Sequence, residues 1–152
     1  MGCLFVVIDL ELRCEDEVEL RDFAEEIVSQ LFSKFGKECK RPFPIIDYQE
    51  CIAKYGTDKP DLRSDDTQNA FLGVVNFPQF IRNNLGEIVT THHPFQMPII
   101  NNTSDITNKT FEIGSSTFDL VLNGVEIGGG DMRINNYEIQ NEVFKVLGLK
   151  SS

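Results

Sequence analysis

The sequence lacks any apolar stretch that could cross a membrane. Its longest early run, residues 4–8, spans five residues and stops at Asp9. A transmembrane helix needs about 18–20 consecutive apolar residues, and a secretory signal would need a longer apolar region than this one. We therefore expect a protein with no membrane segment and no signal peptide.

Basic residues are scarce. Lysine and arginine number 14 against 24 aspartates and glutamates, so the net charge is −10. A free-standing nucleic-acid-binding protein normally carries a basic stripe, and the composition argues against that class. With 41% hydrophobic and 25% charged residues, the chain has an ordinary globular composition, and its length predicts one domain over residues 1–152 with a single core.

Paired cysteine motifs are also absent. Cys3, Cys14, Cys39 and Cys51 form no CxxC pair and have no histidine at metal-ligand spacing. We interpret all four as reduced structural thiols, which predicts a reducing compartment. The cytoplasm fits this best, with an organellar matrix as the alternative.

Every even position from 4 to 12 is apolar, a period of two that predicts a strand. Asp9, Glu11 and Arg13 share the opposite face. That polar face could line a cleft or could simply be the solvated side of a sheet.

Two capping boxes predict helices. Asp16 and Glu19 open a helix that ends at Gly36, with Phe23, Ile27 and Leu31 facing the core. Asp47 and Glu50 open a short helix that ends at residues 55–56. A third helix is predicted over residues 137–147 by the spacing of its apolar residues.

Between these helices the sequence predicts two hairpins. Strands 71–77 and 87–92 are joined by a turn at 83–86, and strands 118–122 and 125–127 by Asn123-Gly124. Residues 64–70 are expected to be a linker, and residues 99–117 a polar loop. This order predicts an α+β fold, an antiparallel sheet flanked by helices. The triplet 128–130 lacks the GxGxxG pattern of doubly wound nucleotide-binding folds.

Three ordered motifs resemble the bacterial and organellar aspartyl-tRNA synthetases, which are class II enzymes. They are YGTDKPDLR at 55–63, THHPF at 91–95 and FDLVLNGVEIGGGDMRI at 118–134. The predicted first strand resembles the second half of that family's motif 2. The resemblance implies a partial class II catalytic domain in which the family's inserted domain has shrunk to the linker at 64–70.

The resemblance implies an aspartate pocket formed by Asp9, His92, His93 and Arg133. Arg133 would hold the side-chain carboxylate of the substrate, a task that suits the guanidinium fork, and Asp9 would contact the substrate ammonium. The two histidines would lie beside the pocket. On the residues alone, His92 and His93 could equally be loop histidines without a ligand, and Arg133 an ion-paired surface arginine.

The resemblance also implies an ATP site. Asp119 and Glu126 would hold magnesium on the phosphates, since hard oxygen ligands suit that ion. Gly128, Gly129 and Gly130 would let the backbone approach the adenylate closely. The alternatives are a cross-strand polar pair for the two acids and a bulged strand end for the glycines.

The two arginines with which the family clamps the phosphates fall outside the matched residues, and Asp131 replaces a serine of the family. We therefore expect negligible aspartyl-adenylate formation by this chain alone. The main hypothesis is a paralogue that retains part of the aspartate or aspartyl-adenylate pocket for binding or regulation, with ATP and magnesium as cofactors implied by the resemblance.

The alternative is a fragment of an active aspartate–tRNA ligase, completed by missing segments or a partner chain. An incomplete sheet would leave an exposed edge, so we expect a homodimer or a partner synthetase. The acidic charge predicts no direct contact with tRNA.

Overall fold

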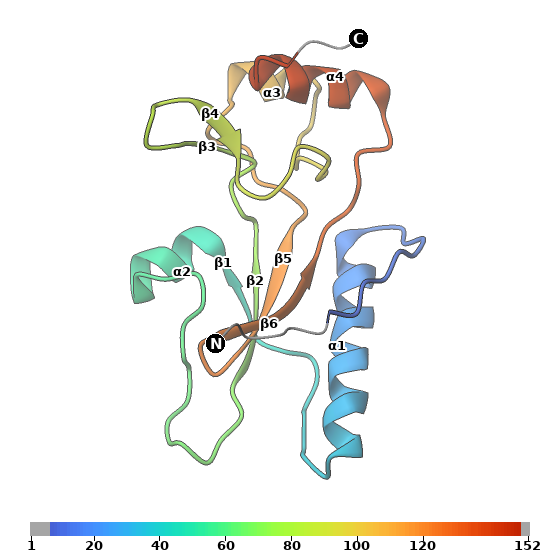
Figure 1. Ribbon diagram of the computed structural model, residues 1–152, viewed down its shortest axis with the longest axis vertical. Coiled ribbons are helices and arrows are strands. Elements are labelled where there is room, and N and C mark those ends of the chain that lie inside the picture. Colours follow the sequence, from blue (N-terminus) through green and yellow to red (C-terminus); the bar gives the residue numbers. More distant parts are fainter. Residues whose placement is uncertain (1–6, 150–152) are drawn as a thin grey trace, which may run out of the picture.

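A four-stranded sheet forms the middle of the molecule in the computed structural model, which describes residues 7–149 (Figure 1). The strand order is β1-β2-β5-β6, and a separate two-stranded sheet pairs β3 with β4. In chain order the elements are α1 (Glu17–Lys34), β1 (Ile45–Asp47), α2 (Tyr48–Tyr55), β2 (Phe71–Val75), β3 (Phe80–Arg82), β4 (Ile88–Thr90), α3 (Asp105–Asn108), β5 (Phe118–Leu122), β6 (Val125–Gly130) and α4 (Tyr137–Val146).

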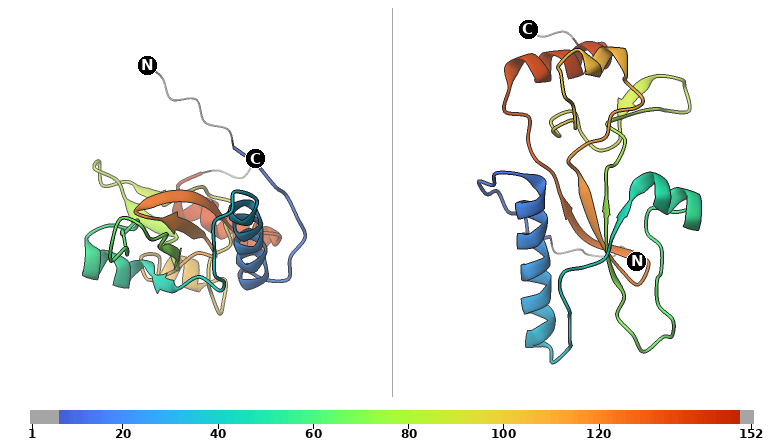
Figure 2. Two further views of the ribbon diagram at one scale, coloured as in Figure 1. Left: turned by 90° about the horizontal axis from the view of Figure 1, so that it is seen from below. Right: turned by 180° about the vertical axis from the view of Figure 1, so that it is seen from behind.

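The predicted α+β class is confirmed. β2, β5 and β6 pair antiparallel, and helices flank the sheet (Figure 2). One pairing departs from a purely antiparallel sheet, because β1 runs parallel to β2. None of the helices described between residues 7 and 149 has the length and hydropathy that a bilayer span requires.

The first helix begins and ends as its sequence predicts. The Glu19 N–H donates to Asp16 Oδ1 at 2.9 Å, which caps α1, and the helix stops before Gly36, whose φ is 67°. The predicted core face is wrong, however. Phe23 is 42% and Leu31 41% exposed. The helix carries two adjacent apolar stripes, and the one that packs on the sheet comprises Leu20, Ala24, Val28 and Phe32.

The two faces of the central sheet are buried under different elements, as the period of two along each strand requires. On one face Phe71, Phe118 and Leu120 pack with Phe43 under α1. On the other face the buried side chains come from α2, β2, β5 and the residues just after β2. They are Cys51, Leu72, Val74, Phe77 and Val121.

A third core joins β3, α3 and α4 at one end of the molecule (Figure 1). It contains Phe80, Ile106, Ile113 and Val143. The prediction of a polar loop at 99–117 is therefore wrong: Ile106 is fully buried, and α3 lies within this segment. Ile106 and Ile113 have helical spacing, but the intermediate positions 109 and 110 are lysine and threonine, so no complete apolar pattern revealed them.

The predicted strand at the start of the chain does not form in the part that the structure describes. Residues 7–12 have no strand pairing, and Val7 is 80% exposed; residues 4–6 lie outside the described range. Alternation fixes which side chains share a face, but a strand also needs a neighbouring ladder of backbone hydrogen bonds. The first predicted hairpin is also corrected, since β4 pairs with β3 and not with β2.

The second hairpin, β5–β6, forms around Asn123 and Gly124, which both have positive φ, 53° and 79°. This is the backbone that a two-residue hairpin turn requires. Leu120 pairs with Gly128 but Val121 with Glu126, so Ile127 is an extra residue on β6. The triplet 128–130 thus follows a β-bulge, as one of the two readings of these glycines proposed.

Gly129 is required by the close approach of β5. A Cβ at this position would lie 2.7 Å from the carbonyl oxygen of Phe118, whereas a Cβ on Gly128 would have no atom within 4 Å. We expect Gly129→Ala to lower the free energy of unfolding by about 1–3 kcal/mol, because the two backbones must separate. Gly128→Ala is the matched control and should change it by less than about 0.5 kcal/mol. Equal effects in urea denaturation would contradict the steric explanation.

Candidate functional site

Six of the predicted site residues line one small depression beside β5 and β6. Its volume is about 240 Å³, below the ~300–1,000 Å³ of sites for drug-sized ligands and of a size for a single amino acid. The predicted members are accompanied by Thr117 and Asp131, and the full lining is His92, His93, Thr117, Asp119, Glu126, Gly129, Gly130 and Asp131.

The acidic end of the depression is formed by Asp119 and Glu126. Asp119 pairs with Gly129 and Glu126 with Val121. The two acids are therefore not directly opposite each other, but they lie on the same face of the hairpin. Burial, and then the negative charge of Glu126, raises the pKa of Asp119 from 3.8 to about 7.

Lys59 is a site residue that we did not single out from the sequence. Its Nζ lies 3.1 Å from Glu126 Oε2 and 3.8 Å from Asp58 Oδ2. The hydrogen bond to Glu126 raises the pKa of Lys59, so this lysine remains protonated. Its place inside the 55–63 motif was the available signal. It brings a positive charge to the acidic end and partly neutralises it.

The two acids fit the magnesium implied by the resemblance. Magnesium in phosphate-handling sites is commonly held by one or two carboxylates, with the remaining ligands from water and phosphates. Among residues 7–149 no group of three or more His, Cys, Asp and Glu side chains is arranged to hold a metal ion. Any magnesium held by Asp119 and Glu126 would thus take its other ligands from water or phosphate, and would neutralise phosphate charge.

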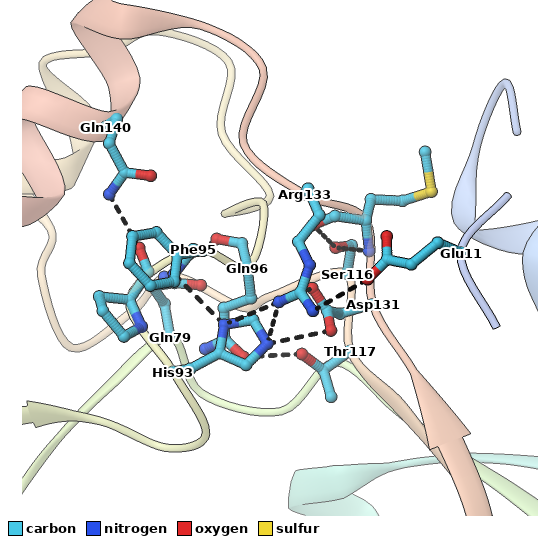
Figure 3. A network of polar contacts seen from close by, with 12 residues as sticks. Glu11, Gln79, His93, Phe95, Gln96, Ser116, Thr117, Asp131, Arg133 and Gln140 are labelled. Carbon is cyan, nitrogen blue, oxygen red and sulfur yellow. Dashed lines mark hydrogen bonds and ion pairs between the residues drawn. The ribbon is translucent and has the colours of Figure 1, made fainter. Parts of the chain in front are cut away.

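The cationic end of the depression takes its charge from Arg133, which is not itself a lining residue but contacts the ring of the lining residue His93 (Figure 3). Arg133 lies in an extended segment after β6 that bridges to Gln96, and its Nη1 contacts the His93 ring. Its side chain is 52% exposed and lies 3.5 Å from Asp131 Oδ1. A guanidinium that remains half exposed beside a depression is accessible to a carboxylate ligand.

The two histidines differ in their surroundings. His92 lies with its ring edge toward Phe77, 5.0 Å between centroids, and partial burial, followed by the proximity of His93, lowers its pKa. His93 accepts from the Phe95 N–H through Nδ1 at 3.3 Å. Nε2 of His93 lies between two partners, Asp131 Oδ2 at 3.1 Å and Nη1 of Arg133.

Of the predicted aspartate-pocket residues, Arg133 lies beside the depression, against His93 and Asp131, and Asp9 does not line the depression either. It lies in the exposed, unpaired segment 7–12. Glu11, from the same segment, approaches Arg133, with 3.9 Å between Glu11 Oε1 and Arg133 Nη2. Gly128 also stays outside the depression, although it adjoins the two glycines that line it.

A buried polar floor that the sequence did not reveal holds the cationic end in place. Thr117 Oγ1 donates to Gln96 Oε1 at 2.8 Å, and the Gln79 side-chain amide donates to the Gln96 carbonyl at 3.4 Å. Met132 N–H donates to Ser116 Oγ at 3.1 Å. These bonds fix the backbone on both sides of Arg133, since residue 96 bridges to residue 133.

Comparison with known families decides the relationship. A family model described as tRNA synthetases class II (D, K and N) matches residues 4–152. The chain belongs to this family. The aspartate–tRNA(Asp/Asn) ligase of Chlamydia trachomatis is 32% identical over 133 residues, which cover 83% of this chain. The ligase of the same name from Campylobacter hominis is 39% identical over 106 residues, or 70% of this chain.

The match covers only a part of these class II ligases. It takes in 23% of the Chlamydia protein and 17% of the Campylobacter protein. The chain therefore spans less than a quarter of the length of the curated relatives that it matches.

Solved class II synthetases share the fold. The asparaginyl-tRNA synthetase of Entamoeba histolytica matches 88% of this chain and 33% of its own, with a TM-score of 0.52 at 20% identity. The same protein in complex with asparaginyl-adenylate has a TM-score of 0.56 at 18% identity, and the match covers 89% of this chain and 34% of that one. At this identity the likeness establishes the fold.

Asp119 should make the stability of the chain depend on pH. An unfolded chain releases this proton near pH 3.8, whereas the folded chain releases it near pH 7. Between these values the folded state binds more protons, so the free energy of unfolding should fall as the pH rises from 4 through 7. Urea denaturation from pH 5 to 8 measures this slope. Asp119→Asn should flatten it, and an unchanged slope in that variant would assign the dependence to another group.

Proposed function

We propose that this chain is an aspartyl-tRNA synthetase-like binding unit that accepts aspartate or aspartyl-adenylate in the depression beside β5 and β6. The observation that carries the proposal is the placement of Arg133 and His93 at one end and two carboxylates at the other. Free aspartate has an ammonium group as well as two carboxylates, so a cleft with both charge signs suits it. The carboxylate of the ligand side chain would bind Arg133 as a charge-assisted pair.

We propose further that the 152 residues by themselves do not activate aspartate. Adenylate formation depends on cations that stabilise the phosphates in the transition state. At the acidic end Lys59 is already paired with Glu126. The phosphates of ATP would bring further negative charge toward Asp119 and Glu126. The magnesium ion that these two acids would hold is the cation left to offset that charge. This supports binding or regulation as the role of the chain alone.

The alternative is a portion of an aspartate–tRNA ligase that other segments or a partner chain complete. The share of the relatives that the chain spans, 23% in the Chlamydia protein, favours this reading. Under either reading the acidic net charge of −10 supports the proposal that this part of the molecule does not itself contact tRNA.

Calorimetric titration with aspartate and an ATP–pyrophosphate exchange assay together test the proposal. We expect aspartate to bind and Arg133→Ala to weaken binding by about tenfold or more, because one charge-assisted pair contributes about 1.5–3 kcal/mol. Arg82→Ala is the matched control: Arg82 lies in the β3–β4 hairpin and stacks over Phe111, so aspartate affinity should be unchanged. Exchange should be undetectable.

Two results would contradict this reading. Binding that survives Arg133→Ala at full strength would remove Arg133 from the pocket. Robust exchange by the purified 152 residues would show that the chain activates aspartate without help and would overturn the binding-unit proposal.

Self-association is a second part of the proposal. Within the described residues the outer edge of β6 has no partner strand, and Val125 and Ile127 on it are exposed, as are Phe23, Leu31 and Phe35 of the outer stripe of α1. An unpaired strand edge next to apolar side chains favours association with another chain. We propose a homodimer, with a partner synthetase as the alternative occupant.

Multi-angle light scattering at micromolar concentration should therefore report a dimer. Val125→Lys should shift the mass to the monomer, because a lysine on a strand edge opposes edge pairing. Leu85→Lys, in the exposed turn between β3 and β4, is the control and should leave the dimer intact. A strict monomer in the unmodified chain would exclude the homodimer.

A further inference from the structure

Asp131 lies against both Arg133 and His93. Its Oδ2 is 3.1 Å from His93 Nε2 and its Oδ1 is 3.5 Å from Arg133 Nη1. Its side chain is only 15% exposed. The carboxylate is thus directed into the site rather than toward solvent (Figure 3).

The backbone forces this arrangement. Residues 131 and 133 are two apart in an extended segment, so their side chains project to the same side. The segment is held by the bridge between Arg133 and Gln96 and by the hydrogen bond from Met132 N–H to Ser116 Oγ. Neither charged side chain can leave the other's vicinity without a change of rotamer.

The hydrogen bonds of Asp131 are incomplete. The Phe95 N–H occupies His93 Nδ1, and Asp131 Oδ2 has the His93 Nε2 as its one hydrogen-bonding neighbour, an atom that also contacts Arg133 Nη1. Asp131 Oδ1 is buried and makes an ion pair with Arg133 but no hydrogen bond. A buried carboxylate oxygen without a hydrogen-bond donor is costly, and the electrostatic attraction of Arg133 is what offsets that cost here.

Other carboxylates contribute less to this cluster. Glu11 Oε1 is 3.9 Å from Arg133 Nη2, but its side chain is 80% exposed, and solvent-exposed pairs contribute about 0–1 kcal/mol. Asp131 is therefore the dominant negative partner of Arg133 among the described residues.

We propose that Asp131 determines the ligand specificity of this cleft by occupying, from within the chain, the Arg133 guanidinium that would receive the side-chain carboxylate of an aspartate-type ligand. This inference rests on the proposed function, since it concerns the same Arg133. Asp131 and His93 both contact Nη1 of Arg133, so a free carboxylate must displace Asp131 before it can form the end-on pair that uses both terminal nitrogens of the guanidinium. The apparent affinity is lowered by the fraction of molecules in which Arg133 is free.

The consequence is a preference between ligands rather than a uniform weakening. A ligand with a side-chain carboxylate competes with Asp131 and is repelled by it. A ligand with a neutral amide in the same place does neither, and can accept from Arg133 while donating to the Asp131 carboxylate. The unmodified chain should therefore discriminate little between aspartate and asparagine.

Asp131→Asn tests this inference, because it removes the charge and keeps the shape and the acceptor for His93. Calorimetric titration with L-aspartate should show binding that is tighter by about tenfold or more. This gain is expected if Arg133 is free of Asp131 in about a tenth of the unmodified molecules or fewer. L-asparagine affinity should change by about twofold or less. Asp131→Glu keeps the charge and should show no gain for aspartate.

Glu38→Gln is the matched control for net charge. It removes one negative charge from an exposed pair with Lys40 in the connection between α1 and β1, and aspartate affinity should stay within about twofold. If Asp131→Asn lowers the unfolding temperature and does not bind, Asp131→Ser provides the second variant, with the same expected gain.

The outcomes separate this inference from the proposed function. Aspartate binding by the unmodified chain with no gain in either neutral variant overturns the role of Asp131 and leaves the binding function in place. Binding by the neutral variants alone supports the role of Asp131 and overturns the proposal that the natural chain binds aspartate. Binding by none of these chains overturns both.

Discussion

The pairing of β5 with β6 is the constraint on which the candidate site depends. The close approach of Gly129 to the Phe118 carbonyl, with the bulge at Ile127, sets the phase of the strand that follows. Asp119 and Glu126 share a face because of that register. β6 continues into the segment that carries Asp131 and Arg133. Glu126 at the acidic end and Arg133 at the cationic end therefore lie on one continuous stretch of backbone.

Charges inside the depression satisfy one another to a large extent. Lys59 pairs with Glu126, and Asp131 with His93 and Arg133. Asp119 makes no ion pair among residues 7–149, and its burial, only partly offset by the charge of Lys59, raises its pKa to about 7. A ligand entering here exchanges internal pairs for external ones, so its affinity depends on the difference between two sets of interactions rather than on the number of polar groups that it meets.

Membership of the class II synthetases of the D, K and N group explains the architecture of the chain. The chain spans less than a quarter of the length of the curated relatives that it matches, and its described residues leave a sheet edge unpaired and several large apolar side chains exposed. The apolar alternation of residues 7–12 and the outer stripe of α1 both have the character of interior surface. Their exposure in this chain is the reason that self-association and completion by another chain are proposed together.

The sequence by itself determined the α+β class, the ends of α1, α2 and α4, and the β5–β6 hairpin, because caps, apolar spacing and the Asn123-Gly124 turn are local signals. It also indicated six residues of the depression through their motifs. It did not reveal which stripe of α1 is buried, that residues 7–12 stay unpaired, or that residues 99–117 contribute core side chains. Only the tertiary structure decided that Lys59 reaches Glu126 and that Asp131 occupies His93 and Arg133. The contacts of His93 with Asp131 and of Lys59 with Glu126 each join residues that are 38 or more positions apart. No local sequence pattern encodes where such distant segments meet.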